Sequence, residues 1–477
     1  MTTSGEAGIA VGRPAEGILT RSVVWLAAVA GLAVGAVIWP RIAGVAALVL
    51  LVAFVWTHPR AALHTLSFAA LAVRPSLDRF SERQLGLGPF ALQPAVIFGG
   101  LVLAAGVVLA LRRAHDGRRL WPDADLLRTH VWLAAAYGIM ALAGSWLYGA
   151  EGVNQAVREV LRVGSVVAAF LVMYWWLDEE PRAIGRAWMY LALGAVLPLL
   201  VAMEQLVTGT GFIEPDGTLR LQGTFSHPNS FAQYLIPLIC ALVAGQGRRS
   251  WRMGLAVALS VVVALTYSRT AILALAAALP IVLVLESRLD ARHAARVVLA
   301  LIFIGGAIWL LAGGMITRRF AGVAFDGASV QDALAGQSEN SFQWRVINWA
   351  GLVLLGLNHP WFGHGAGMTT VLNPLVNDNN GVPFNAHDDY VRFFFEGGVT
   401  ALACYMIYQG LLIWWVLRRS RVVTAERRGA ALALGGSLCG MTFLTAGTTE
   451  LSLHTANLYV LYGLLAIASI DRRSVSP

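Results

Sequence analysis

The chain has 477 residues, of which 57% are hydrophobic and 13% are charged, and its mean hydropathy is +0.65. This composition excludes an ordinary soluble domain and predicts an all-α, polytopic membrane protein. The net charge of +8 could indicate nucleic-acid binding, but the arginines concentrate in the loops between apolar segments. Because that is the positive-inside pattern, we expect membrane lipids around the chain and no nucleic acid as a partner.

Apolar segments of about 16–25 residues recur from Val23 to Ile470. Residues 1–22 are expected to form a cytoplasmic tail, 23–314 a transmembrane bundle, 389–470 the C-terminal transmembrane helices and 471–477 a second cytoplasmic tail. We predict about 12 spans, within 12–14, because the pairs near 42–73 and 252–286 are short enough to be broken or re-entrant. The segments are 23–39, 42–57, 61–73, 91–111, 127–147, 155–177, 183–207, 229–246, 252–267, 270–286, 296–314, 389–417, 430–446 and 454–470.

Arginines are distributed unevenly between the loops. They cluster at 112–119, 248–252, 288–296 and 418–428, and Arg472 and Arg473 lie in the C-terminal tail. These loops are predicted to be cytoplasmic, and the intervening loops at 208–228, 267–270, 315–388 and 447–453 are predicted to face outward. Chemistry on the outward side cannot rely on ATP, and the sequence contains neither a Walker loop nor a dinucleotide fingerprint. We therefore expect no cofactor.

The only long outward loop, 315–388, carries recognisable local structure. The stretch 341–357 places Phe342, Trp344, Ile347, Trp349, Leu352 and Leu355 among polar residues, which predicts an amphipathic helix on the membrane surface or over a cavity. A tight glycine-rich turn is predicted at 360–367, and the run 377–381 is typical of a turn.

Metal chemistry is not supported by the sequence. The three cysteines lie in apolar segments without metal-ligand spacing, which indicates packing residues. Asp123 and Asp125 resemble the Asp-x-Asp of metal-dependent glycosyltransferases, but after Pro122 on the cytoplasmic side they are better interpreted as a helix start. No outward group of aspartates shows convincing ligand spacing, so we predict no metal site.

The segment 385–398 ends the long outward loop and begins the next span, and it places His387 at the boundary between water and lipid. Histidine is suited to proton transfer near neutral pH, so His387 is a candidate general base. The alternative is a structural role at a helix start, with Asn385 as the N-cap and Asp389 favouring the positive helix end. Asp388, Arg392 and Glu396 share one helix face and could form a structural ion network.

A few arginines lie on the outward side at specific places. Arg220 precedes a span, Arg269 lies between two short apolar segments, and Arg345 is embedded in the amphipathic stretch. Each could extend to lipid headgroups, or together they could bind a phosphate group in an outward cavity. Arg158 and Arg162 could join them, or could form internal ion pairs with Glu159 or Glu204.

The chain resembles the bacterial O-antigen ligase family, within the wider O-antigen ligase and polymerase superfamily. The resemblance extends over most of the length in topology, with many spans and one large periplasmic loop before the last three helices. The motifs that carry it are Arg220-x-x-Gly223-Thr224 with Pro228-Asn229, Ser268-Arg269, Arg345 with Trp349, His359-Pro360 with Gly363-x-Gly365, and His387-x-x-Tyr390 with Glu396-x-Gly398. The ligases usually follow this histidine with Asn, Ser or Gln, whereas Asp388 stands here.

The resemblance implies a metal-independent, inverting glycosyltransferase of the GT-C kind in the bacterial inner membrane, with its active site facing the periplasm. It would transfer O-antigen polysaccharide from undecaprenyl pyrophosphate to lipid A-core during lipopolysaccharide biosynthesis. Carried onto this sequence, His387 would be the general base, and Arg220, Arg269 and Arg345 would hold the pyrophosphate. Arg158, Arg162, Asp389 and Tyr390 would support the site.

Two alternatives remain open from the sequence. An O-antigen polymerase would use the same donor with another lipid-linked glycan as acceptor, although the single long outward loop favours the ligase. A transporter or flippase for a lipid-linked glycan would show charges at the bilayer midplane and internal repeats, whereas the charges cluster at outward helix ends.

Overall fold

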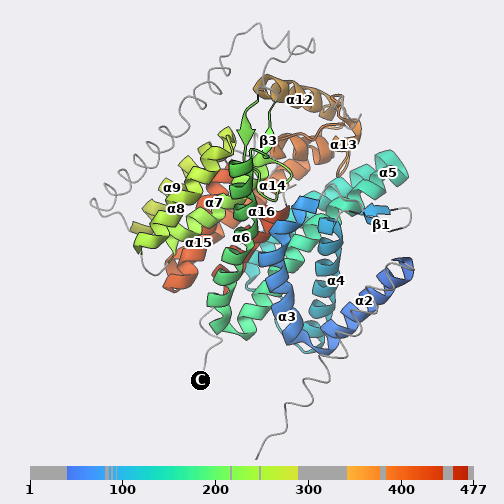
Figure 1. Cartoon of the computed structure of the whole chain (residues 1–477). Helices are drawn as coiled ribbons and strands as arrows, with labels where there is room; N and C mark the ends of the chain where they lie inside the picture. The colour runs from blue at the N-terminus through green and yellow to red at the C-terminus, as the bar shows by residue number, and fades with distance from the viewer. Residues whose placement is uncertain are drawn as a thin grey trace, which may run out of the picture.

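The structure is a computed structural model, and it describes residues 40–80, 85–87, 90–92, 94–214, 217–245, 249–287, 341–376, 383–443 and 455–470. The described chain is almost entirely helical, as the sequence predicts (Figure 1). The predicted spans at 23–39 and 296–314 and the predicted turn at 377–381 lie outside the described residues.

The first half of the chain forms helices close to the predicted boundaries, with two short antiparallel hairpins between them. The elements are α2 (Pro40–Thr57), α3 (Pro59–Phe68), the π-helical turn η1 (Ala69–Val73), the 3₁₀ turn η2 (Arg74–Phe80), β1 (Leu85–Leu87), β2 (Phe90–Leu92), α4 (Pro94–His115), α5 (Ala124–Glu179), η3 (Pro181–Ala183), α6 (Ile184–Thr208), β3 (Phe212–Ile213) and β4 (Leu219–Arg220).

The second half contains the helix at the predicted amphipathic stretch and the helices of the C-terminal part. Its elements are α7 (Pro228–Ala244), α8 (Arg249–Leu265), α9 (Arg269–Ser287), α12 (Ser341–Gly356), α13 (Thr369–Leu372), α14 (Asp389–Val422), α15 (Ala425–Leu438), the π-helical turn η4 (Cys439–Phe443) and α16 (Thr455–Ser469). The predicted amphipathic helix is confirmed as α12. In Figure 1, α12, α13 and β3 lie together at the upper end of the molecule.

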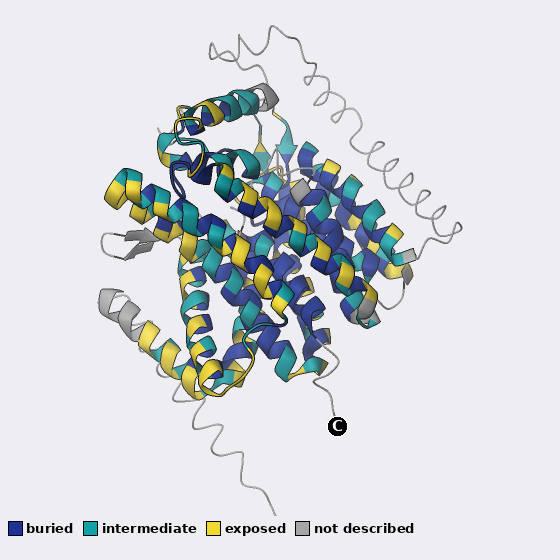
Figure 2. Ribbon diagram, turned by 180° about the vertical axis from the view of Figure 1, so that it is seen from behind, coloured by how far each residue is buried: buried dark blue, intermediate teal, exposed yellow. Residues whose placement is uncertain are grey.

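Five helices in the described part of the chain, α4, α5, α6, α9 and α14, are long and apolar enough to cross a membrane. Large apolar side chains point outward from several of them, including Leu142, Trp146 and Val207, which are 74%, 88% and 81% exposed. Figure 2 shows such exposed positions along the outer faces of the helices, around a buried interior. A water-soluble protein would bury these side chains, so the outward faces favour contact with lipid.

Helix α5 is a hairpin of two antiparallel helices, which confirms the predicted spans at 127–147 and 155–177. The chain reverses at Gly149, whose φ is +55°. The rings of His130 and Phe170 stack with centroids 5.8 Å apart, and Trp175 Nε1 donates to the Leu120 carbonyl at 2.9 Å. Asp123 is the N-cap of α5, because its side chain accepts from the Leu126 N–H at 2.6 Å. The Asp-x-Asp is therefore a helix start, as predicted.

Helix α14 is also broken, at Gly398, whose φ is +65°. The nine residues before the break fold back against the long part of the helix, and the Phe393 ring stacks on Tyr405 with centroids 4.0 Å apart. The sequence predicts one uninterrupted span over 389–417, and that prediction is wrong at its start. Only a glycine adopts this backbone without a steric penalty, and a hydropathy pattern does not report it.

The predicted glycine-rich turn at 360–367 packs against the break in α14 and forms hydrogen bonds with the backbone on both sides of it. The N–H groups of His364 and Gly365 donate to the carbonyls of Phe395 and Glu396, at 2.9 and 2.7 Å. In the other direction, the Val399 N–H donates to the Pro360 carbonyl at 2.8 Å. The turn thus satisfies backbone groups that the interrupted helix cannot satisfy itself.

The arginine-rich loops meet at the opposite end of the bundle, where arginines cap the C-terminal ends of helices. Arg427 donates to the Ile470 carbonyl at 3.0 Å, Arg428 to the Leu285 carbonyl at 3.0 Å, and Arg252 to the Leu242 carbonyl at 2.7 Å. Cations are favoured there because the last carbonyls of a helix have no partner within it.

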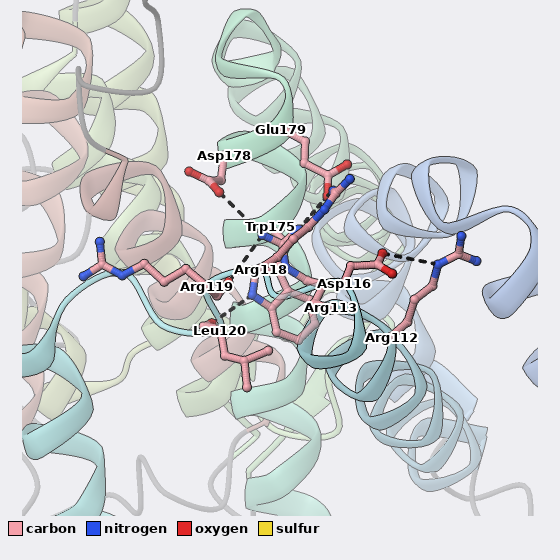
Figure 3. A network of polar contacts seen from close by, with 9 residues as sticks. All are labelled: Arg112, Arg113, Asp116, Arg118, Arg119, Leu120, Trp175, Asp178 and Glu179. Carbon is pink, nitrogen blue, oxygen red and sulfur yellow. Dashed lines mark hydrogen bonds and ion pairs between the residues drawn. The ribbon is translucent and has the colours of Figure 1, made fainter.

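The α4–α5 loop belongs to the same end of the molecule and forms the polar network shown in Figure 3. Arg113 contacts Glu179 at 2.5 Å and Asp178 at 3.6 Å, and Arg118 contacts Glu179 at 2.7 Å. These contacts tie the loop to the C-terminal end of α5. The described members of the predicted cytoplasmic loops therefore share one end of the molecule.

The close approach of the glycine-rich turn to α5 gives a test of this packing. Gly365 has a φ of +109°, and a Cβ there would lie 2.1 Å from Gly144 Cα. We expect Gly365→Ala to lower the free energy of unfolding by roughly 2–5 kcal/mol, from backbone strain and steric overlap. Thermal unfolding in detergent measures the loss. Gly410→Ala is the control, because a Cβ at Gly410 meets nothing within 4 Å, and an equal loss in both variants would contradict the packing argument.

Candidate active site

His387 lies at the start of α14 beside the surface helix α12. Its φ is +55°, a left-handed conformation that residues other than glycine rarely adopt. Its ring meets the Trp344 ring edge-on, with centroids 5.4 Å apart, and the residue is half-buried. Such strain is common at functional sites, where the surrounding structure imposes it.

Asp388, and not Asn385, is the N-cap of α14. Its Oδ1 accepts from the Val391 N–H at 2.9 Å, so the predicted cap at Asn385 is wrong by three residues. Desolvation by burial raises the pKa of Asp388 to about 6, and the hydrogen bonds from the backbone of Val391 and Tyr390 offset only part of that rise. Asp388 thus places an acidic group next to His387.

Asp389 and Tyr390 turn toward the interior of the bundle. Asp389 is fully buried and accepts from the Tyr405 hydroxyl at 3.3 Å. Tyr390 is half-buried, with its ring centroid 6.4 Å from that of Tyr405. They are the second and third residues after His387 in the chain.

A buried ion network connects α14 to α5. Glu159 binds both Arg392, at 2.5 Å, and Arg162. Arg392 also contacts Glu396 at 3.2 Å, and Thr369 Oγ1 donates to Glu396 at 2.8 Å. The predicted network on the face of α14 is thus confirmed for Arg392 and Glu396, and the predicted internal pair of Arg162 with Glu159 is confirmed as well. Arg158, by contrast, lies on the exposed side of α5.

Arg220 is buried and joins three parts of the chain. Its Nε donates to the Thr266 carbonyl at 2.7 Å, its Nη1 to Glu214 at 2.5 Å, and its Nη2 to Asn229 at 2.9 Å. Because a guanidinium is planar, these three bonds fix the direction in which the side chain points. The bond to Thr266 also brings Arg220 to the turn that leads into Arg269, the first residue of α9.

The candidate residues form two groups at one end of the molecule. Arg220 and Arg269 flank the turn between α8 and α9, whereas Arg345 lies on α12 next to Trp344, which contacts His387. Figure 1 shows β3, α12 and the beginning of α14 at this end. Among the described residues, no three His, Cys, Asp or Glu side chains gather in a geometry that could hold a metal ion.

Residues 254–406 match the family model described as O-antigen ligase. The chain carries an O-antigen ligase domain. The resemblance inferred from the motifs is thereby confirmed, and the domain contains Arg269, Arg345 and His387. Members of this family are membrane proteins with glycosyltransferase-like activity. A comparison with curated proteins found no significant match.

Two other histidines at this end of the molecule, His227 and His364, have structural partners. His227 is the N-cap of α7, and its Nδ1 accepts from the Asn229 N–H at 3.1 Å. His364 is buried between the Tyr148 hydroxyl at 2.6 Å and the Leu355 carbonyl at 3.0 Å. Burial lowers the pKa of His364 and favours its neutral form.

The sequence argument overlooked two buried amides in the O-antigen ligase domain, Asn348 and Asn373. Both contact the loop that precedes His387. A signal was present for Asn348, because it lies four residues from both Trp344 and Leu352 and is therefore a polar residue on the apolar face of the amphipathic helix. Asn373 follows a helix of only four residues, and no periodic pattern marks it.

The ion network predicts a large effect of a small change at Glu159. We expect Glu159→Gln to lower the free energy of unfolding by about 3–5 kcal/mol, because it removes the charge that compensates Arg162 and Arg392. Thermal or denaturant unfolding in detergent measures this loss. Arg158→Gln, on the exposed side of the same helix, should change stability by less than about 0.5 kcal/mol. Equal effects of the two substitutions would contradict a buried network.

The raised pKa of Asp388 predicts a pH-dependent stability. Between about pH 4 and pH 6 the folded state holds a proton on Asp388 that the unfolded state has lost, so this residue makes stability fall as pH rises. Asp388→Asn keeps a capping side chain and should remove that contribution. We expect the variant to equal the wild type near pH 4 and to exceed its stability by up to roughly 3 kcal/mol at pH 7. A constant difference across this range would contradict the raised pKa.

Proposed function

We propose that the protein is an O-antigen ligase that transfers O-antigen polysaccharide from undecaprenyl pyrophosphate to lipid A-core. One observation supports this most: the O-antigen ligase domain holds His387 in a strained conformation at the end of the molecule where Arg220 also lies, with Arg345 on the adjacent helix. A histidine can take the proton from a sugar hydroxyl, and arginines can bind a pyrophosphate. Both activities are needed for this transfer.

In the proposed reaction, His387 accepts the proton of the acceptor hydroxyl as its oxygen attacks the anomeric carbon of the donor. The bond from that carbon to the pyrophosphate oxygen breaks on the opposite face, so the configuration inverts and undecaprenyl pyrophosphate leaves with the electron pair. A positioned base contributes about 10²–10⁴-fold in rate. Pyrophosphate is already a good leaving group once its charge is neutralised, so the reaction needs no general acid.

Arg220, Arg269 and Arg345 are proposed to neutralise that charge in place of a metal ion. Arg220 fits this role because its bonds to the Thr266 carbonyl, Glu214 and Asn229 fix the direction of the guanidinium. A group held in advance stabilises developing charge without reorganisation. Arg162 and Asp389 would support the site indirectly. Arg162 is connected to Arg392 through Glu159, and Asp389 accepts a hydrogen bond from Tyr405.

The proposed enzyme lies in the bacterial inner membrane, as a GT-C-like bundle of about 12 spans with the site facing the periplasm. The arginine caps at the opposite end support this orientation, because arginine-rich loops remain in the cytoplasm. Both substrates are anchored in lipid. An active site at the outer ends of the helices would therefore meet their head groups directly.

The proposal is tested with purified protein, an undecaprenyl-pyrophosphate-linked glycan and lipid A-core. We expect wild-type protein to transfer the glycan and His387→Ala to lose at least about 10²-fold in rate while it keeps a wild-type unfolding temperature. Arg220→Ala should also be impaired, and Arg220→Lys only partly restored, because an ammonium cannot replace the planar fork. EDTA should leave the rate unchanged.

Each other outcome has a definite meaning. Glycan elongation without lipid A-core would identify a polymerase, and retained transfer by His387→Ala would exclude His387 as the base. Inhibition by EDTA that a divalent ion reverses would overturn the metal-independent mechanism. If folded protein glycosylates neither acceptor, the enzyme proposal fails and a transporter becomes the better interpretation.

A further inference from the structure

The three residues that precede His387 are held by side chains through their backbone carbonyls. Asn373 Nδ2 donates to the Phe384 carbonyl at 2.7 Å, and Asn348 Nδ2 donates to the Asn385 carbonyl at 2.8 Å. The Ala386 carbonyl accepts from Trp349 Nε1 at 2.9 Å and also from Asn348 at 3.3 Å. Every carbonyl from 384 to 386 therefore has a side-chain donor.

The donors are themselves fixed. Asn348 and Asn373 are 1% and 3% exposed, and Asn373 Nδ2 donates to Asn348 Oδ1 at 2.7 Å. Asn373 Oδ1 in turn accepts from the Leu375 N–H at 3.0 Å. Asn348 thus uses its oxygen toward Asn373 and its nitrogen toward the loop. An amide serves both sides, whereas a carboxylate has no donor and an apolar side chain has neither group.

These bonds act on a residue that would not keep its conformation alone. The left-handed backbone of His387 costs about 1–3 kcal/mol, and it persists only where the surroundings determine it. On one side, the cap at Asp388 starts α14, and on the other the three held carbonyls fix the approach of the chain. The Trp344 ring, on the same helix as Asn348 and Trp349, closes one side of the imidazole.

We propose that Asn348, Trp349 and Asn373 are positioning residues that set the place of the His387 imidazole relative to the reacting sugar. This inference rests on the proposed function, since it assumes that His387 takes a proton during transfer. The three residues act through the backbone of His387 and need no contact with substrate. A misplacement of about 1 Å in a catalytic group can cost about 10²-fold in rate, so the hydrogen bonds to the carbonyls of residues 384–386 matter for catalysis as well as for folding.

Asn348→Asp is the sharpest variant. It keeps the side-chain volume and the oxygen that accepts from Asn373, but it replaces the donor amide by an oxygen that faces the carbonyls of Asn385 and Ala386. We expect kcat to fall about 10²-fold. KM for the donor should rise much less than kcat falls, because Arg220 and Arg269 lie on other elements and only Arg345 shares α12 with Asn348.

A matched pair of tryptophan variants separates positioning from general stability. Trp349→Phe removes an indole N–H bond to a carbonyl at 2.9 Å, and Trp175→Phe removes a bond of the same kind and length at the opposite end of the molecule (Figure 3). Both should lower the unfolding temperature by a few degrees. Only Trp349→Phe should lower kcat for the folded fraction, measured after size-exclusion chromatography.

The outcomes distinguish the two proposals. Active wild type, inactive His387→Ala and full kcat in both Asn348→Asp and Trp349→Phe would overturn the positioning role alone. If Asn348→Asp does not fold, Trp349→Phe decides: a selective loss of kcat supports the role, and equal kcat in Trp349→Phe and Trp175→Phe overturns it. Wild-type protein without transfer activity would instead refute the proposed function on which the inference rests.

Discussion

The structure depends on an exchange of backbone hydrogen bonds between the glycine-rich turn and the break in α14. The break frees the carbonyls of Phe395 and Glu396, and the turn supplies the N–H groups of His364 and Gly365. In a lipid environment each unpaired backbone group costs several kcal/mol, so a transmembrane helix is interrupted only where another segment completes its bonds. Because the turn does so here, the short first part of α14 can fold back and place His387 beside α12.

The same exchange determines where the charges of α14 lie. With the helix folded back, Arg392 reaches Glu159 on α5, and Glu396 lies beside Thr369 just after the turn. Arginines therefore have different tasks at the two ends of the molecule. At one end they cap helix carbonyls in the loops that the positive-inside rule assigns to the cytoplasm, and at the other they balance buried carboxylates or, as we propose for Arg220, bind an anion.

The proposed catalytic arrangement joins two requirements that conflict in a simple helix bundle. A base must approach a sugar in water, yet both proposed substrates are anchored in lipid. In the proposed orientation, α14 begins at the outer surface and α12 holds the residues just before it, so the arrangement meets both conditions. The strain at His387 is offset by amide and indole donors, and the buried Asn348 amide would otherwise have no reason to lie on the apolar face of α12.

The sequence by itself determined the helices, their approximate ends, the amphipathic stretch of α12, the glycine-rich turn and the helix start at Asp123. It offered the pairs of Arg162 with Glu159 and of Arg392 with Glu396 as one of two interpretations, which the structure confirms. Each of these follows from patterns within a few residues, which composition, periodicity and spacing report directly. The tertiary structure alone decided the break at Gly398, the cap at Asp388, the contact between Glu159 and Arg392 and the clamp of Asn348 on the loop before His387. These features consist of hydrogen bonds and ion pairs between segments far apart in the chain, and their energies depend on which groups the fold removes from water.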